Sequence, residues 1–162
     1  RDPVLRRQAA WDVFQAAKSL GNDYFLYLKL HPREGADKPY YEAIAKEVGC
    51  SNYDFAGNED LYRIIAACQV LITCFSTVGT ETVYFYKPLI ILDHLKQDIQ
   101  NYHKEGVAYQ ATCSSELITC IEALTKSNFK VDRDMYGKFI EKYAYRIDGK
   151  ACERALRPIE EN

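Results

Sequence analysis

The sequence predicts an α/β fold, a three-layer Rossmann-like domain in which helices cover both faces of a parallel sheet. The first observation is that apolar runs alternate with helical stripes along all 162 residues. The second is that the longest runs lack polar alternation, which is typical of strands buried on both faces. The third is the repeated order strand, helix, strand, because that order makes neighbouring strands parallel.

The helices are predicted from apolar residues spaced at positions 0, 3, 4 and 7. Residues 4–20 carry this pattern, and Gly21 then suits the left-handed end of a helix. The pattern returns at residues 41–48. Further helices are expected over 61–68, 79–86, 115–124, 134–145 and 150–156. Ser114 or Ser115 is the expected cap of the helix that ends at 124.

The strands are predicted from the apolar runs. Tyr24–Leu30, Val70–Phe75 and Leu89–Leu92 are nearly unbroken, so both faces of these strands are expected to be covered. Tyr53–Ala56 and Val107–Gln110 are shorter, and the latter is expected at an edge of the sheet. Because ligands of such sheets bind at the carboxyl ends of strands, the residues that follow each strand are the ones to examine.

Composition and charge limit the classes of function. The length fits a single domain, residues 1–162, with a helical tail from about 133 to 162. A formal net charge of −2 argues against a nucleic-acid partner. No apolar run approaches the roughly 20 residues that span a bilayer. The six cysteines show no metal-binding spacing, so we expect buried, reduced thiols and no metal.

The segment Ser76–Glu81 is the strongest candidate for a phosphate site, because it joins a buried strand to a helix. The hydroxyls of Ser76 and Thr77 are expected to cap that helix, with its first amides pointing at an anion. Gly79 would let the ligand approach closely. Glu81 would accept from ribose hydroxyls, and Thr80 beside it is also expected to contact the ribose or base. A ligand-free N-cap followed by a favourable glutamate explains the same residues.

This segment is neither a Walker loop, since no Gly-Lys-Ser/Thr follows, nor the three-glycine dinucleotide fingerprint. An NTPase and a simple NAD enzyme are therefore disfavoured.

Other strand ends add candidate ligands. His31 and Arg33 follow the first strand and can donate hydrogen bonds to a phosphate, although His31 can equally pack at the sheet edge. Phe55 and Gly57 lie at the end of the second strand and just after it, where the segment Phe55-Ala56-Gly57 could offer backbone groups to a nucleobase, or form an ordinary turn. Asp93-His94 follows the fourth strand, where it would touch a sugar or close a loop.

Four motifs together resemble a known family. They are Leu30-His31-Pro32, the helix-to-strand segment Ala66–Thr73, the Ser-Thr-x-Gly-x-Glu of Ser76–Glu81, and Lys87-Pro88-Leu89-Ile90. The pattern is similar to the C-terminal, donor-binding domain of GT-B glycosyltransferases from bacterial surface-polysaccharide synthesis. That group includes capsule Kdo transferases, sialyltransferases and CDP-glycerol glycerophosphotransferases, and UDP-N-acetylglucosamine 2-epimerases share its fold.

The resemblance implies roles for the candidate residues. His31, Ser76 and Thr77 would bind the donor's phosphate, Glu81 would face its ribose, and the loop at 55–57 would face its base. The Asp-Tyr-Ser-Ser form common in glycerophosphotransferases is Cys74-Phe75-Ser76-Thr77 here, which argues against that branch. The epimerase's double-glycine turn is also absent.

The expected function is therefore donor binding in a glycosyltransferase that uses a CMP-, CDP- or UDP-linked sugar for surface polysaccharide or glycoconjugate synthesis. A 2-epimerase and a non-catalytic nucleotide-binding module are the alternatives. The chain does not begin with Met, and the resemblance places the catalytic base on an N-terminal domain that we expect to be missing, so the isolated chain should be inactive.

The nucleotide-sugar is a substrate, and no cofactor is expected. The expected partners are that donor and the missing domain. The expected location is the cytoplasm. A position at the inner face of the membrane is left open, with any peripheral contact made by the missing part.

Overall fold

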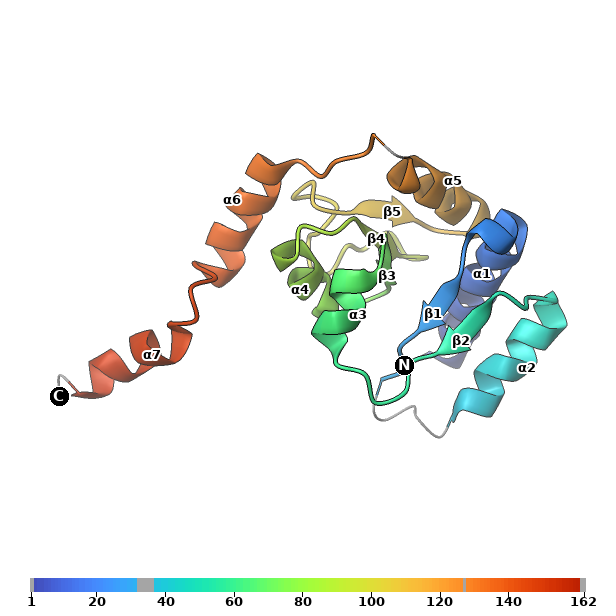
Figure 1. Cartoon of the computed structure of the whole chain (residues 1–162), viewed down its shortest axis with the longest axis horizontal. Helices are drawn as coiled ribbons and strands as arrows, with labels where there is room; N and C mark the ends of the chain where they lie inside the picture. The colour runs from blue at the N-terminus through green and yellow to red at the C-terminus, as the bar shows by residue number, and fades with distance from the viewer. Residues whose placement is uncertain (1, 32–36, 127, 161–162) are drawn as a thin grey trace.

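A computed structural model of the chain describes residues 2–31, 37–126 and 128–160, and it shows the predicted alternation of strands and helices (Figure 1). The helices are α1 (Pro3–Leu20), α2 (Lys38–Val48), α3 (Leu61–Ala67), α4 (Val78–Tyr84), α5 (Ser114–Thr125), α6 (Arg133–Ala144) and α7 (Ala151–Glu160), with a short 3-10 turn at Gly21–Asp23. The strands are β1 (Leu26–Leu28), β2 (Tyr53–Phe55), β3 (Leu71–Thr73), β4 (Leu89–Leu92) and β5 (Tyr109–Ala111).

The described strands form two hydrogen-bonded groups, and every pair is parallel. One group is β1–β2, with Leu26 opposite Tyr53. The other has the order β3–β4–β5, with β4 in the centre and β5 at an edge. The predicted parallel α/β class is therefore confirmed, and β5 lies at an edge as expected.

Strand β4 shows how helices come to cover both faces of its sheet. Its four residues are all buried, and side chains alternate between faces along a strand. Leu89 and Ile91 pack in a cluster with residues of α4 and α6. Ile90 and Leu92 pack in the opposite cluster with residues of α1 and α5. The apolar run 89–92 is thus a strand buried on both faces, as the sequence predicts.

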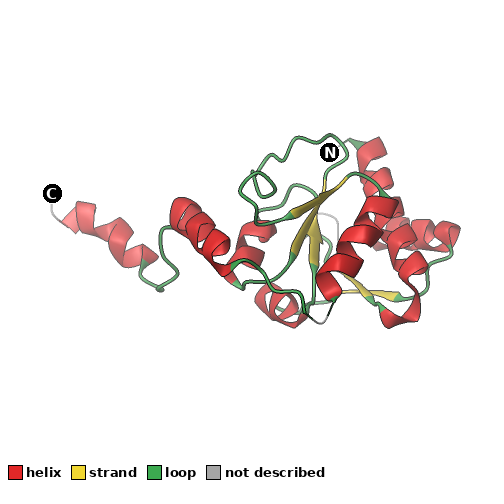
Figure 2. Ribbon diagram, turned by 90° about the horizontal axis from the view of Figure 1, so that it is seen from above, coloured by secondary structure: helices red, strands yellow, loops and turns green. Residues whose placement is uncertain are grey.

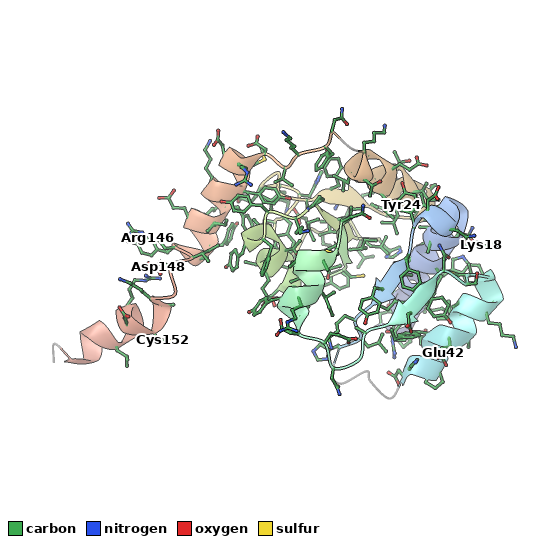
Figure 3. The ribbon with its side chains drawn as sticks, in the orientation of Figure 1. Lys18, Tyr24, Glu42, Arg146, Asp148 and Cys152 are labelled. Carbon is green, nitrogen blue, oxygen red and sulfur yellow. The ribbon has the colours of Figure 1, made fainter. Side chains whose placement is uncertain are left out.

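Helix α1 extends over both groups of strands. Its Phe14 packs in the cluster that contains residues of α2, β1 and β2. Its Ala16 packs in the cluster that contains residues of β4 and α5. Near the end of α1, Lys18 donates to the Val48 carbonyl at 2.8 Å, and the hydroxyl of Tyr24, which precedes β1, lies 3.1 Å from Oγ1 of Thr125 in α5 (Figure 3). The two groups of strands therefore lie side by side beneath one helix.

The expectation that both faces of Tyr24–Leu30 are covered is wrong. Leu26 and Leu28 contact the α1–α2 cluster, but Phe25 is 65% exposed and Tyr27 is 40% exposed. The physical reason is that α1 and α2 both pack on the same face of β1. An unbroken apolar run cannot reveal which neighbours its second face will have.

The crossover helices change face between β1 and β3. Helix α2, which follows β1, packs on the same face as α1. Helix α4, which follows β3, packs with α6 on the opposite face. Such a change of face marks the switch point at which doubly wound sheets bind ligands. The loops that follow β1 and β3 therefore flank the expected binding crevice.

The C-terminal helices leave the body of the protein. Helix α6 buries Tyr136, Phe139 and Ile140 beside α4. Helix α7 then extends away from the strands (Figures 1 and 2), and Asp148 and Cys152 lie on this extension (Figure 3). Within the described part of the chain, no helix is long and apolar enough to cross a membrane.

All six cysteines carry free thiols. Their predicted burial holds only for Cys50, because Cys152 is exposed and the others are half-buried. Few of these thiols therefore act as core residues.

Candidate functional site

The turn between β3 and α4 is organised mainly by Ser76. The Ser76 hydroxyl accepts a hydrogen bond from the Val78 amide at 3.2 Å, and the Ser76 carbonyl accepts one from the Gly79 amide, also at 3.2 Å. Thr77 occupies the N-cap position, but its side chain is exposed and makes no capping hydrogen bond. Of the two predicted caps, only Ser76 acts as one.

The side chain of Tyr102 completes this turn from a distant loop. The Thr80 amide donates to the Tyr102 hydroxyl at 3.0 Å, and Thr80 Oγ1 lies 2.9 Å from the same oxygen. The Tyr102 hydroxyl in turn donates to the Ser76 carbonyl at 3.2 Å. The amides of Val78, Gly79 and Thr80 therefore donate to oxygens of the protein in this structure, and their predicted contact with an anion stays a prediction.

Tyr102 also explains why residue 79 is glycine. The ring is 1% exposed and packs against Phe139, and its burial raises the pKa of the phenol. A Cβ atom on Gly79 would lie 2.5 Å from Cε2 of this ring. The glycine thus makes room for a side chain of the protein, and its predicted contact with a ligand stays a prediction.

Sequence reasoning missed Tyr102 because the residue lies in the long loop between β4 and β5, where no periodic pattern marks any position. The sequence gives one hint that this loop is ordered, because it contains two aspartates, Asp93 and Asp98, whose side chains anchor it. Asp93 Oδ2 accepts from the Asp98 amide at 2.7 Å and from Gln110 Nε2 at 2.9 Å. Asp98 Oδ2 accepts from the Lys104 amide at 2.8 Å. Of the two roles left open for Asp93, the structure favours loop closure.

Glu81 lies one helical turn beyond Ser76 and is half-buried. Its Oε2 atom is buried, and no donor among the described residues bonds to it. Buried carboxylate oxygens normally have a donor. The predicted contact of Glu81 with a ribose hydroxyl stays a prediction.

The remaining candidates follow β1 and β2. His31 is exposed beyond the end of β1, and Arg33 lies outside the described residues. Phe55 is half-buried and packs beneath the Lys38 ammonium, whose Nζ lies 5.0 Å from the ring centroid. Gly57 is exposed, and its carbonyl accepts from Lys29 Nζ at 3.4 Å.

The structure brings only part of the predicted site together. Ser76 and Thr80 share the Tyr102 hydroxyl. His31 and Ser76 flank the switch point, but they follow strands that belong to separate hydrogen-bonded groups. The hydrogen bonds between strands therefore do not fix the distance between the His31 imidazole and the turn at Ser76.

A second histidine, His94, lies at the same edge of the sheet. It follows β4 directly after Asp93, and its Nε2 lies 2.8 Å from Oδ2 of Asp12 on α1. Asp12 is 3% exposed, and its Oδ1 accepts from the Ser114 amide at 3.0 Å. Asp12 thereby occupies the capping role at the start of α5 that was expected of a serine hydroxyl.

Comparisons with known proteins agree with this fold. The sequence profile of the family described as "CDP-Glycerol:Poly(glycerophosphate) glycerophosphotransferase" matches residues 3–161. The structure is similar to UDP-GlcNAc 2-epimerase from Neisseria meningitidis, with a TM-score of 0.56 and 13% identity over 96% of this chain and 41% of that one. At that identity the likeness concerns the fold alone.

Two curated proteins are similar in sequence. One is the teichoic acid poly(glycerol phosphate) polymerase of Bacillus subtilis, 23% identical over 158 residues, which are 91% of this chain and 20% of that protein. The other is the teichoic acid poly(ribitol-phosphate) polymerase of Bacillus spizizenii, 26% identical over 160 residues, which are 91% of this chain and 24% of that protein. The chain thus spans a quarter or less of these relatives.

The family match confirms the resemblance to surface-polysaccharide transferases and corrects one detail of it. The Cys74-Phe75-Ser76-Thr77 sequence was expected to argue against the glycerophosphotransferase branch, yet that branch is the one whose profile matches. The physical reason is that Ser76 supplies the local cap. The residues at positions 74, 75 and 77 can therefore differ from the Asp-Tyr-Ser-Ser form while the turn keeps its conformation.

Proposed function

The chain belongs to the CDP-glycerol:poly(glycerophosphate) glycerophosphotransferase family, and we propose that it is the donor-binding half of an enzyme that transfers a polyol phosphate from a CDP-linked donor. The observation that carries this proposal is the match of the family profile to residues 3–161, almost the whole chain. Of the CMP-, CDP- and UDP-linked donors that the sequence leaves open, the proposal selects the CDP-linked class.

A CDP-linked donor changes the chemistry expected of the site. In transfer of a glycerol phosphate, an acceptor hydroxyl attacks the phosphorus next to glycerol, and CMP leaves. Negative charge then develops on the phosphates, where hydrogen-bond donors stabilise it. The hydroxyls of Ser76 and Thr77 and the imidazole of His31 are such donors, and each charge-assisted contact contributes about 1.5–3 kcal/mol.

The position of these groups supports the proposal. They flank the switch point between β1 and β3. The turn at Ser76 is held by the buried Tyr102 hydroxyl. Glu81 lies in the first turn of α4, and its carboxylate Oε2 has no donor among the described residues. Phosphates at the turn and a ribose at Glu81 would be one helical turn apart.

The rest of the enzyme follows from the relatives' length. Because the chain spans a quarter or less of the two polymerases, we place the acceptor site on a further domain of the same protein. Transfer would occur at the cytoplasmic face of the membrane, in the synthesis of a cell-surface polymer. The chain by itself would bind donor and turn over nothing.

Titration calorimetry of the full-length protein with CMP, CDP-glycerol and UDP tests the donor class. We expect CDP-glycerol and CMP to bind, and UDP to bind at least about tenfold more weakly, a difference of 1.4 kcal/mol. His31→Ala and Ser76→Ala should each weaken CMP binding by about tenfold. His103→Ala is the matched control, since the His103 side chain is exposed and its Nδ1 lies 3.1 Å from the Ala108 carbonyl oxygen.

Other results would overturn the proposal. Transfer from a UDP-linked sugar, with no use of CDP-glycerol, would make the protein a sugar transferase. Inversion of UDP-N-acetylglucosamine would make it an epimerase. Absence of binding by all three ligands would leave a module without a donor site.

A further inference from the structure

Each of the two groups of strands has an edge without a hydrogen-bonded neighbour among the described residues. The Leu26 amide of β1 donates at 2.9 Å to the carbonyl of the residue before β2, and the Leu71 amide of β3 donates at 3.0 Å to the carbonyl of the residue before β4. Successive peptide groups of a strand point to opposite edges. The N–H and C=O groups of Tyr27 and Ile72 therefore point away from β2 and β4, to edges where the described part of the chain offers no strand.

These two open edges face each other. Figure 1 shows the strands from top to bottom in the order β5, β4, β3, β1 and β2, so β1 and β3 are the inner strands of their groups. Helix α1 lies over both, because its Phe14 packs in the cluster of β1 and its Val13 packs on the same cluster as Ile72 of β3. Since no hydrogen bond between described residues joins β1 to β3, the sheet is interrupted beneath α1.

The burial of β3 agrees with an open edge. All three residues of β3 are half-buried, whereas β4, which is paired on both edges, is buried throughout. The apolar run Val70–Phe75 was expected to be covered on both faces, as the run of β4 is. A further strand beside β3 would supply the burial that this run lacks.

The order of the strands identifies the element that fits the gap. In the doubly wound fold with strand order 3-2-1-4-5-6, the first strand lies between the second and the fourth. The groups β2–β1 and β3–β4–β5 match 3-2 and 4-5-6. Helices α1 and α2 pack on one face and α4 on the other, as crossovers on the two sides of that first strand do. The gap is therefore the position of the strand that precedes α1.

We propose that residues preceding Arg1 in the full-length protein form a strand that lies between β1 and β3, parallel to both, and joins the two groups into one sheet. The relatives have ample chain for it, since this chain spans 20% and 24% of them. Arg6 of α1 bonds at 2.8 Å to Asp37, at the N-cap position of α2, so α1 begins at the carboxyl edge of the strands. A strand that enters α1 through a short loop ends at that edge, and it is therefore parallel to β1 and β3.

The gap also defines the chemistry of this strand. Both of its edges are paired, one with β1 and one with β3, which excludes proline from its middle. Helix α1 covers one of its faces, and central strands of parallel sheets are apolar on both faces. We expect a run of about 4–8 apolar, mainly β-branched residues that ends about 2–6 residues before α1.

The loop from this strand to α1 would complete the donor site, a consequence that rests on the proposed function. The loop leaves the sheet between His31, which follows β1, and the turn at Ser76, which follows β3. Ligands of doubly wound sheets bind at this point. Backbone groups of the loop would then lie next to the phosphates of the donor, between the imidazole and the hydroxyl turn.

Hydrogen exchange of the full-length protein, resolved by residue, tests the strand. We expect the amides of Tyr27 and Ile72 to exchange on the order of 10²-fold more slowly than that of Gln110, because paired strand amides open rarely. Gln110 is the matched control. The Asp93 amide of the β4 end bonds to the Ala111 carbonyl of β5, so the neighbouring Gln110 amide points to the outer edge. Exchange at Tyr27 and Ile72 as fast as at Gln110 would overturn the proposal.

A crystal structure of the full-length protein identifies the occupant of the gap. We expect a strand from the residues before Arg1, at about 4.8 Å from β1 and from β3. Direct pairing of β1 with β3 would overturn the proposal, as would an unfilled gap. A strand from a second copy, or from another part of the chain, would also overturn it.

The strand and the proposed function fail separately. CMP should slow exchange both in the turn at Ser76 and in the loop before α1. If the strand is present and CMP slows exchange at the turn alone, only the contribution of that loop to the site is refuted. If neither CMP nor CDP-glycerol binds to the full-length protein, the proposed function is refuted while the strand stands.

Discussion

The two groups of strands lie beneath the same helix, α1, yet they are held very differently. The β3–β4–β5 sheet has a core on both faces, and all four residues of β4 are buried. The β1–β2 pair has a core on one face only, and Phe25 and Tyr27 of its other face are exposed. The Ser76 turn follows a strand of the group with two buried faces, whereas His31 follows a strand of the group with only one. In the proposed donor site, the Ser76 side therefore has the more extensive packing beneath it.

The largest contrast should appear when one apolar residue of each group is truncated. Ile90→Ala removes a fully buried side chain between α1 and α5, and we expect a loss of about 2–5 kcal/mol in the free energy of unfolding. Phe25→Ala removes a side chain from the open face, with an expected change within about 0.5 kcal/mol. Denaturant unfolding at equilibrium measures both.

Equal losses of unfolding free energy in Ile90→Ala and Phe25→Ala would contradict the difference between the two groups of strands. They would mean that the open face of β1 is covered in solution.

A second contrast concerns glycines near and far from the turn. Gly79→Ala places a methyl group 2.5 Å from the buried Tyr102 ring and should cost about 1–3 kcal/mol in stability. Gly137→Ala in α6 meets nothing within 4 Å and should stabilise the protein by about 0.5–1 kcal/mol. Thermal melting of both variants measures the difference. If Gly79→Ala keeps full stability but loses CMP binding, the glycine serves the ligand and not Tyr102.

The attachment of β1–β2 to α1 depends on Asn52. Its Nδ2 donates toward the carbonyls of Ala17, Gly21 and Tyr24 at 2.9–3.0 Å. Asn52→Ala leaves these carbonyls without that donor, and we expect a loss of about 2 kcal/mol. Hydrogen exchange should report faster opening of β1 and β2 than of β4. Asn22→Ala, at an exposed position of the neighbouring turn, is the control and should change neither. Uniform opening of all strands would show that the two groups unfold as one.

The smallest predicted effect lies beneath the three-stranded sheet. The Tyr136 hydroxyl donates to the carbonyls of Lys87 and Val107 at 3.1 and 3.0 Å, so Tyr136→Phe should cost about 1 kcal/mol. Burial raises the pKa of this phenol, which means that the folded protein favours its neutral form.

The sign of the pH dependence follows from this shift. Below the unfolded pKa of about 10 the stabilisation by Tyr136 is fully present, and it is lost as the pH rises above that value. The melting temperature of the wild type should therefore fall toward that of Tyr136→Phe between about pH 9 and 12, because an unperturbed phenol ionises in that range. A constant difference across that range would show that the phenol ionises alike in both states.

Much of the fold could be predicted from the sequence. In those parts, the helices and strands that the local hydrophobic pattern predicts are the ones that tertiary packing stabilises. The stripe in residues 4–20 and the run 89–92 correspond to α1 and β4. Patterns also located the candidate residues at strand ends. They failed at the start of α5, where Ser114 or Ser115 was expected to cap and Asp12 does so from a distant helix. They failed again at Tyr102, which reaches the turn from an aperiodic loop.

The sequence patterns predicted the α/β class, the order of the elements and the wider group of surface-polysaccharide transferases, because hydrophobic periodicity and strand-end motifs act over short stretches of chain. Only the tertiary structure decided that β1 keeps one open face, that Tyr102 holds the turn at Ser76, and that Asp12 meets His94. Each of these depends on which segments pack together across long separations. A local sequence pattern cannot predict such contacts, because the same pattern is compatible with several tertiary arrangements.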